Sequence, residues 1–278
     1  MAGSFVNINN AREGVPTAKH GDAGERLQPL MRSKGKSRDI PPSLFMPMPA
    51  AFRQSPRVEA LHKYCPGSFH PVHLGDTFKQ SRYTVIHKLG FGTFATVWLV
   101  KDSLNENYAS LKIIVSQASE WSENSSSEEL RVLQHLQAGE GEGKEYVIQL
   151  LDHFEHEGPN GVHLCIVTEV LGPSLASQFF EVFPDDKLPL EFAKRFISQA
   201  TKGVRYLHSR DVVHGDFHPG NFLLYSSHFS TWRTQEDVEK DLDKPEQHSF
   251  PLSDDTLASF NSHIPKYTVY VPDYVPVL

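Results

Sequence analysis

The chain has 278 residues, of which 39% are hydrophobic and 22% are charged, and its formal net charge at pH 7 is -7. This composition suits a folded soluble domain, permits basic substrates and gives no general attraction to nucleic acid or an anionic membrane. No apolar run approaches the ~18 residues of a membrane helix, and no secretory signal is apparent. Cys65 and Cys165 lie in unrelated contexts, which favours a reducing compartment and no disulfide.

The first segment, residues 1–62, is rich in Pro, Gly, Ser, Ala and charge, which predicts a disordered N-terminal arm. Its basic residues leave a mitochondrial transit peptide as an open alternative. Acidic residues interrupt them, however, and transit peptides are usually poor in acids. Order is expected to begin near Tyr64.

An α+β domain is predicted next, with a five-stranded antiparallel sheet and one helix. The strands are expected at 83–89, 95–100, 108–115, 146–154 and 163–170. Glycine-containing turns join the first strand to the second and the fourth to the fifth. Residues 128–136 have a helical period and follow a serine run that supplies possible caps.

Helical patterning then takes over, with an apolar face along residues 190–209. Residues 212–225 are expected to form a loop flanked by short strands. Residues 226–278 are polar and contain prolines, so a mostly irregular tail is predicted.

The turn between the first two strands has the pattern of a phosphate-binding loop. It reads Leu89, Gly90, Phe91, Gly92, Thr93, Phe94, Ala95, Thr96 and Val97. Glycines let backbone N–H groups approach phosphate oxygens without interference from a Cβ atom. A purely structural hairpin is the alternative.

Lys112 is the second candidate functional residue, because it lies among apolar residues in the third strand. Lysine is rarely buried unless it is paired. The nearest candidate partner is Glu129, on the helix that follows. The alternative is an edge lysine whose ammonium group lies in water.

The third candidate is the run from His214 to Asn221, which follows the long helix. Its spacing suits a base, Asp216, that accepts a hydroxyl proton and an amide, Asn221, that holds a metal ion, with His214 bracing the backbone. A polar turn is the alternative, since these are all turn residues. His218 is not predicted to be a metal ligand, because no zinc-site spacing surrounds it.

The ordered set Gly90, Gly92, Lys112, Glu129, Asp216 and Asn221 resembles a eukaryotic-type protein kinase. Residues 64–67, 70–78, 82–83 and 89–99 look like the SR-protein kinases, and residues 169–172 are similar to their hinge. The resemblance implies a protein-kinase-like fold with a complete five-stranded N-lobe, helix C and a partial helical C-lobe. The N-lobe would span 63–167, the hinge, the start of the C-lobe and the catalytic loop 168–225, and an insert-like tail 226–278.

For function, the resemblance implies ATP- and Mg²⁺-dependent phosphorylation of serines in Arg/Ser-rich splicing factors. The setting would be cytoplasmic or nuclear, without direct contact to nucleic acid or membrane. By position, Leu89 to Val97 would cover the phosphates, and Lys112 would contact them while pairing with Glu129. The implied adenine-side residues are the gatekeeper Thr168 and the hinge residues Glu169 and Leu171. Asp216, Lys112 and His218 would be catalytic, and Asn221 would bind one Mg²⁺.

Three departures from the kinase pattern keep alternatives open. Gly215 stands where many kinases have an arginine, which the SR-protein kinases also lack. His218 replaces a lysine that neutralises γ-phosphate charge, and a histidine does this only partly at neutral pH. No Asp-Phe-Gly or Ala-Pro-Glu motif comes after Asn221.

Because of the missing motifs, the chain is expected to be the first half of a kinase domain, inactive by itself. The alternatives are an inactive nucleotide-binding or scaffold fragment and a small-molecule kinase. The run from His214 to Asn221 also resembles aminoglycoside and choline phosphotransferases, which is the basis of the second alternative.

Overall fold

The computed structural model describes residues 6–8, 58–59, 61–116, 128–176, 187–249, 263, 265 and 267–269. All of them belong to one compact unit. Most of the expected arm, residues 1–62, lies outside the described residues. One described part is β1 (Val6–Ile8), which pairs in parallel with β8 (Phe222–Leu224).

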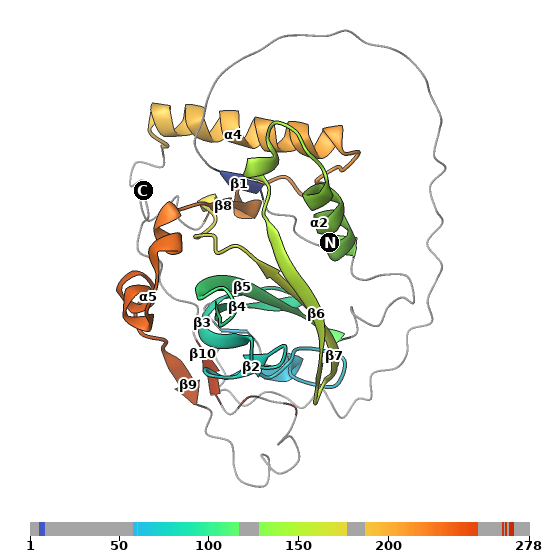
Figure 1. Ribbon diagram of the computed structural model, residues 1–278, viewed down its shortest axis with the longest axis vertical. Coiled ribbons are helices and arrows are strands. Elements are labelled where there is room, and N and C mark those ends of the chain that lie inside the picture. Colours follow the sequence, from blue (N-terminus) through green and yellow to red (C-terminus); the bar gives the residue numbers. More distant parts are fainter. Residues whose placement is uncertain are drawn as a thin grey trace, which may run out of the picture. The chain divides into compact units, whose positions relative to one another are not determined.

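The central element is an antiparallel sheet with the strand order β2-β3-β4-β5-β7-β6 (Figure 1). The strands are β2 (Thr77–Phe78), β3 (Tyr83–Phe91), β4 (Ala95–Asp102), β5 (Asn107–Ile114), β6 (Leu150–Gly158) and β7 (Gly161–Thr168). The expected count of five strands is therefore wrong by one, because β2 is too short to show an alternating pattern. The fourth expected strand begins later than predicted, since residues 144–146 form a 3-10 turn.

The sheet has one face devoted to the core. Ala109, Leu111 and Ile113 of β5 are at most 1% exposed and pack with Trp98 and Val167, among others. Side chains alternate along a strand, so the intervening residues of β5, including Lys112, point to the opposite face. The candidate site is built on that second face.

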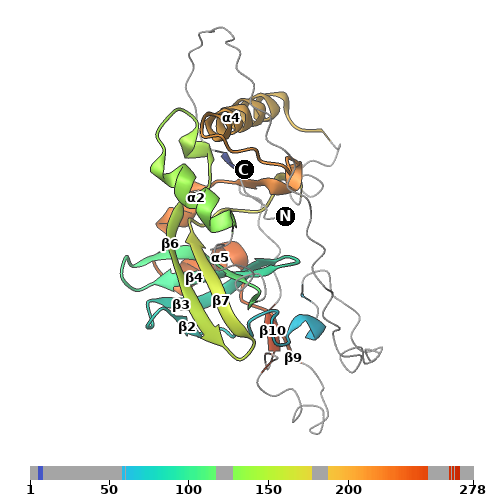
Figure 2. The ribbon, with the colours of Figure 1, turned by 90° about the vertical axis from the view of Figure 1, so that its right-hand side faces the viewer.

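One helix packs on the sheet, and a second packs on the end of the first. In α2 (Glu128–Ala138), Leu130 and Leu133 pack against Ile166 of β7. The long helix α4 (Leu190–Ser209) has the predicted bounds. The Tyr206 hydroxyl donates to the Leu136 carbonyl at 2.5 Å, so α4 is tied to the end of α2, which lies beneath it in Figure 2.

The tail contains more regular structure than predicted. Its described elements are η5 (Ser227–Thr231), α5 (Gln235–Leu242), β9 (Gln247–Ser249) and β10 (Tyr267–Val269). Thr234 and Asp237 form a capping box that begins α5. Trp232 is buried between η5 and α5, and its indole N–H donates to Asp241 at 2.6 Å. The tail is polar in overall composition, but a few buried apolar residues, including Phe229 and Trp232, fix it to the rest of the fold.

Membrane insertion of a helix has no support in the described part of the chain. None of the helices there is both long and apolar enough to span a bilayer.

Candidate active site

Lys112 lies in the middle of the sheet, opposite Val97 on β4 and Ile166 on β7. Its Nζ atom donates to both carboxylate oxygens of Glu129, at 2.6 and 2.7 Å. The Lys112 side chain is 20% exposed and that of Glu129 is 9% exposed. The expected ion pair is thus present, and the alternative of an edge lysine in water does not describe this side chain.

The position of Glu129 follows from its place in α2. Glu128 and Glu129 occupy the first turn of the helix, where the positive end of the helix dipole stabilises carboxylates. The apolar face of α2 then holds the helix on the sheet, which brings Glu129 to Lys112. The pair therefore depends both on the local sequence that begins α2 at Glu128 and on the packing of α2 against the strand that carries Lys112.

The glycine turn connects β3 to β4. Phe91 pairs with Thr96, and the Gly92 N–H donates to the Ala95 carbonyl at 2.8 Å. A Cβ atom added to Gly90 or Gly92 would meet no heavy atom within 4 Å. Packing inside the protein therefore does not require glycine at either position, whereas close approach of a ligand to the backbone would.

The expected hinge residues follow the end of β7. Thr168 lies opposite Ser110 of β5, in register with the strand of Lys112. The Glu169 carboxylate accepts from the Gln149 N–H at 3.0 Å, and Leu171 is buried. The structure thus places these residues beside the sheet face of Lys112, while their contacts to adenine stay a prediction.

The expected catalytic loop is held together by Asn221. Its side-chain amide donates to the Asp216 carbonyl at 2.8 Å and to Asp216 Oδ2 at 3.1 Å. The amide nitrogen is therefore committed to Asp216, which leaves the amide oxygen as the atom suited to a cation. Phe222, directly after Asn221, is buried and begins β8, so the loop is anchored in the fold.

Two histidines flank Asp216. The Asp216 N–H donates to His214 Nδ1 at 3.3 Å, as expected of a histidine that braces the loop. His218 Nδ1 accepts from the Gly220 N–H at 3.0 Å, and its Nε2 lies 3.6 Å from Asp216 Oδ2. Gly215 between them has a φ of 74°, a conformation that favours glycine. This backbone requirement explains why a residue other than arginine stands there.

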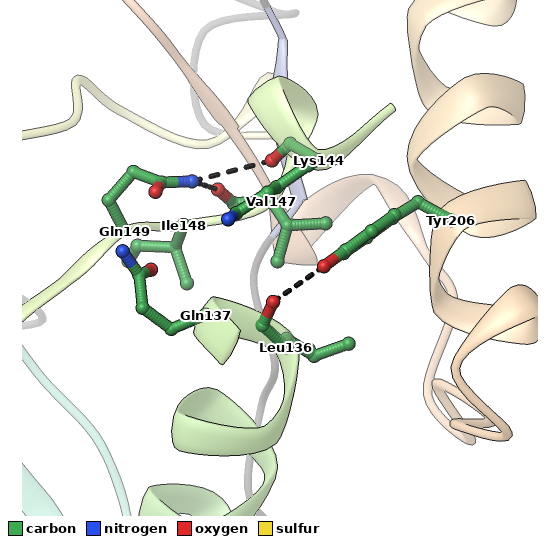
Figure 3. Close-up of a pocket in the computed structure, with 7 residues that line it drawn as sticks. All are labelled: Leu136, Gln137, Lys144, Val147, Ile148, Gln149 and Tyr206. Atoms are coloured by element: carbon green, nitrogen blue, oxygen red, sulfur yellow. Dashed lines mark hydrogen bonds between the residues drawn. The ribbon is translucent and has the colours of Figure 1, made fainter. Parts of the chain in front are cut away.

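A small pocket lies where the end of α2, α4 and the start of β6 meet (Figure 3). It is lined by Leu136, Gln137, Lys144, Val147, Ile148, Gln149 and Tyr206, and its empty space of about 150 Å³ includes open solvent. Ligand sites typically offer ~300–1,000 Å³, so this pocket is too small for a nucleotide. Its residues join α2, α4 and the start of β6, and we assign it a structural role.

Two features of the site region are not predicted from the sequence. One is the packing of the tail, where Phe229 and Trp232 join Tyr108 and Val170 beside the hinge. The other is Lys88, which is fully buried and paired with Glu59. The rule that singled out Lys112 also applies to Lys88, because both are lysines in strand-forming apolar runs.

Known proteins match this arrangement. The family described as "Protein kinase domain" matches residues 83–231, more than half of the chain. Serine/threonine-protein kinase SKY1 of Saccharomyces cerevisiae is 35% identical over 60% of this chain and 23% of its own length. Protein kinase dsk1 of Schizosaccharomyces pombe is 33% identical over 77% of this chain and 38% of its own. Human SRSF protein kinase 3 is 37% identical over 58% of this chain and 28% of its own. The chain thus spans less than two fifths of each relative.

Proposed function

Because the chain belongs to the protein kinase family, we propose that it acts in ATP- and Mg²⁺-dependent phosphorylation of serine or threonine in proteins. The SR-protein-kinase type is supported by the named relatives, which are 33–37% identical to this chain. Since the chain spans only part of each relative, activity and substrate are proposed for the protein as a whole.

The observation that carries the proposal is the ion pair in which the Lys112 ammonium group donates to both carboxylate oxygens of Glu129. It holds the ammonium group of a partly exposed lysine at one place on the sheet face against which α2 packs. Phosphoryl transfer depends mainly on positioning and on charge stabilisation of the phosphates. A lysine held in this way supplies both.

The residues around this pair fit a nucleotide. Gly90 and Gly92 leave open space above the backbone of the turn, which phosphate oxygens could approach. Thr168, Glu169 and Leu171 continue from the strand next to Lys112, so an adenine ring would lie between them and the turn. Leu89, Phe91 and Thr93 to Val97 complete the proposed cover.

A magnesium ion also fits the catalytic loop. Among the described residues, no three or more His, Cys, Asp or Glu side chains are grouped to hold a metal by themselves. Mg²⁺ commonly takes one or two carboxylates together with substrate phosphates, so a complete protein cage is not needed. Asn221, through its amide oxygen, would hold the ion together with the phosphates. When bound, it supplies charge neutralisation at the phosphates.

The roles of the loop residues follow from their contacts. Asn221 fixes Asp216 through Oδ2, which leaves the other carboxylate oxygen to orient a substrate hydroxyl and take its proton. His218 would contribute positive charge near the phosphates when it is protonated. His214 and Gly215 keep the backbone of Asp216 in place.

The finer assignments belong to the same proposal. The sheet and α2 would be an N-lobe with helix C, residues 63–167, and residues 168–225 would be the hinge, early C-lobe and catalytic loop. Residues 226–278 would be an insert. Arg/Ser-rich splicing factors are the proposed substrates, supported by the name SRSF protein kinase 3 and by the net charge of -7. A cytoplasmic or nuclear location goes with such substrates.

The test has two parts: titration of ATP·Mg²⁺ into the 278-residue chain, and transfer of label from γ-labelled ATP to an Arg/Ser-repeat peptide by a version extended through an Asp-Phe-Gly motif and a C-lobe. We expect binding that Lys112→Met weakens and transfer that Asp216→Ala abolishes. Binding without transfer would favour the inactive nucleotide-binding alternative. Absence of binding, or binding indifferent to Lys112→Met, would refute the assigned site.

A further inference from the structure

A second buried ion pair lies close to the glycine turn. Lys88 is 0% exposed, and its ammonium group donates to one carboxylate oxygen of Glu59. The hydroxyl of Tyr64, also buried, donates to the other oxygen. A segment before the sheet is therefore bonded to strand β3. Glu59 and Tyr64 both precede residues 83–231, the part that matches the kinase family.

The ammonium group of this pair also contacts aromatic rings, one of which belongs to the turn. The Lys88 Nζ atom lies 5.5 Å from the ring centroid of Phe91, between the two glycines, and 5.1 Å from that of Trp98. The pairing of β3 with β4 shifts register between Lys88 and Gly90, at Leu89. Such irregularities bend a strand and re-aim the residues beyond them. Lys88 is thus the last paired residue of β3 before this irregularity, and only the paired residues Gly90 and Phe91 separate the irregularity from the turn.

A second connection approaches the turn from the other side. Tyr64 packs with Val115, which directly follows β5. The Val115 N–H donates to the Phe94 carbonyl at 2.9 Å. Phe94 lies at the exposed end of the turn. The segment that carries Glu59 and Tyr64 is thereby connected to both arms of the turn.

A buried ion pair is a poor source of net stability, because removing both charges from water offsets much of their attraction. Its directional bonds can instead select one arrangement of the chain. Here the bonds join a preceding segment to the base of the turn, where a shift would move every N–H group that faces a phosphate. The pair can therefore fix the position of the glycine turn, even if it adds little to the free energy of unfolding.

We propose that Glu59, Tyr64 and Lys88 form an anchor that holds the glycine turn in its nucleotide-binding position. This inference rests on the proposed function, since it assigns the turn to ATP. The three side chains are positioning residues, because they act on the turn through Phe91 and Phe94.

The test replaces the anchor by apolar side chains of similar size, in the triple variant Glu59→Leu, Tyr64→Phe and Lys88→Met. No buried charge is left without a partner, so the variant is expected to fold and melt cooperatively. Hydrogen exchange of the Gly92 amide, which bonds to Ala95, is measured without nucleotide, and the affinity for ATP·Mg²⁺ by titration. We expect faster exchange and weaker binding, each by about two- to thirtyfold, the range from an exposed to a desolvated cation–π contact.

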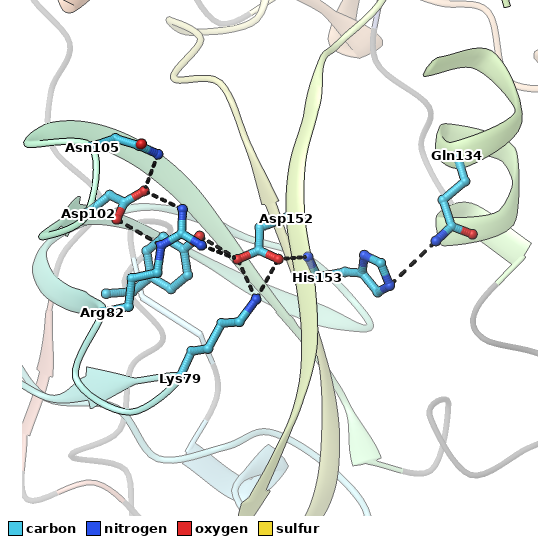
Figure 4. Close-up of polar contacts among 8 residues, drawn as sticks. Lys79, Arg82, Asp102, Asn105, Gln134, Asp152 and His153 are labelled. Atoms are coloured by element: carbon cyan, nitrogen blue, oxygen red, sulfur yellow. Dashed lines mark hydrogen bonds and ion pairs between the residues drawn. The ribbon is translucent and has the colours of Figure 1, made fainter. Parts of the chain in front are cut away.

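A matched control is available at the other end of β3. Lys79 and Arg82 converge on Asp152 there, with Lys79 Nζ 2.6 Å from each carboxylate oxygen (Figure 4). Lys79→Met removes the same ammonium group as Lys88→Met, but far along the strand from the turn. It should leave Gly92 exchange and ATP affinity unchanged. The Val85 amide, which donates to Asp76, serves as an internal reference in every variant.

Failure of the anchor and failure of the proposed function are distinguishable. If the wild-type chain does not bind ATP, the function fails, and Gly92 exchange alone decides the anchor. A folded triple variant with unchanged Gly92 exchange overturns the anchor. If the triple variant does not fold, Phe91→Leu removes the ring above Lys88 without exposing a charge. Unchanged exchange in that variant also overturns the anchor, and selective acceleration at Gly92 supports it.

Discussion

Acid should destabilise the sheet through a cluster of histidines around His70. His156 and His163 lie directly opposite each other on β6 and β7, and their ring centroids are 4.7 and 5.0 Å from that of His70. Burial lowers the pKa of His70 to about 3, and nearby His156, His163 and His73 contribute to that shift. Burial also lowers the pKa of His156, with Asp76 acting against that shift.

The sign and size follow from proton linkage. Below the ordinary histidine pKa of ~6.5 the unfolded chain binds a proton at His70, whereas the folded chain does not bind it until about pH 3. The free energy of unfolding therefore falls as the pH drops through this window. For His70 alone, the expected loss between pH 7 and pH 5 is about 2 kcal/mol.

The assay is urea unfolding at pH 7 and pH 5 for the wild-type chain and for His70→Phe. An aromatic ring keeps the contact with Phe78, which lies edge-on to His70, and cannot be protonated. The pH-dependent loss should shrink in the variant by about 2 kcal/mol. A control, His153→Gln, changes an exposed histidine on the same strand as His156 and should leave the loss unaltered. Equal losses in the wild type and in His70→Phe would refute the reasoning.

Three further predictions concern the site and its support. Lys112→Met should weaken ATP binding about ten- to hundredfold, the worth of a hydrogen bond to a charged group, as measured by calorimetric titration. Asp216→Ala should leave ATP affinity unchanged and reduce label transfer to peptide by about 10²–10⁴-fold, so a large change in affinity would contradict its assignment as the base. Trp232→Ala should lower the free energy of unfolding by about 3–5 kcal/mol, since the side chain is 1% exposed, and a loss below about 1 kcal/mol in urea unfolding would show that the tail does not pack as described.

Most strands of the sheet could be predicted from the sequence alone. The strands around Lys112 were predicted from β-rich runs bounded by glycine-containing turns, and the helix of Glu129 from its helical period, and both signals depend on local neighbours. The bounds of α4 were predicted correctly for the same reason, because its apolar face repeats over 20 residues. β2 was missed, since two residues show no period, and the start of β6 was displaced by a 3-10 turn.

The order of the candidate functional residues along the chain could also be recognised from the sequence alone. Gly90, Lys112, Glu129, Asp216 and Asn221 are recognisable by spacing, and their order is what resembles a protein kinase. The family match over residues 83–231 agrees with that interpretation. Their individual roles toward ATP and Mg²⁺ stay predictions that the proposed assays address.

Tertiary structure decided the contacts between segments far apart in the chain. Glu59 meets Lys88 across 29 positions, and Trp232 reaches Tyr108 from the tail, with ring centroids 5.8 Å apart. No local period encodes such contacts, because they depend on which surfaces remain uncovered once the sheet has formed. The sequence by itself thus determined the elements and the chemical groups, whereas folding decided which segments support them.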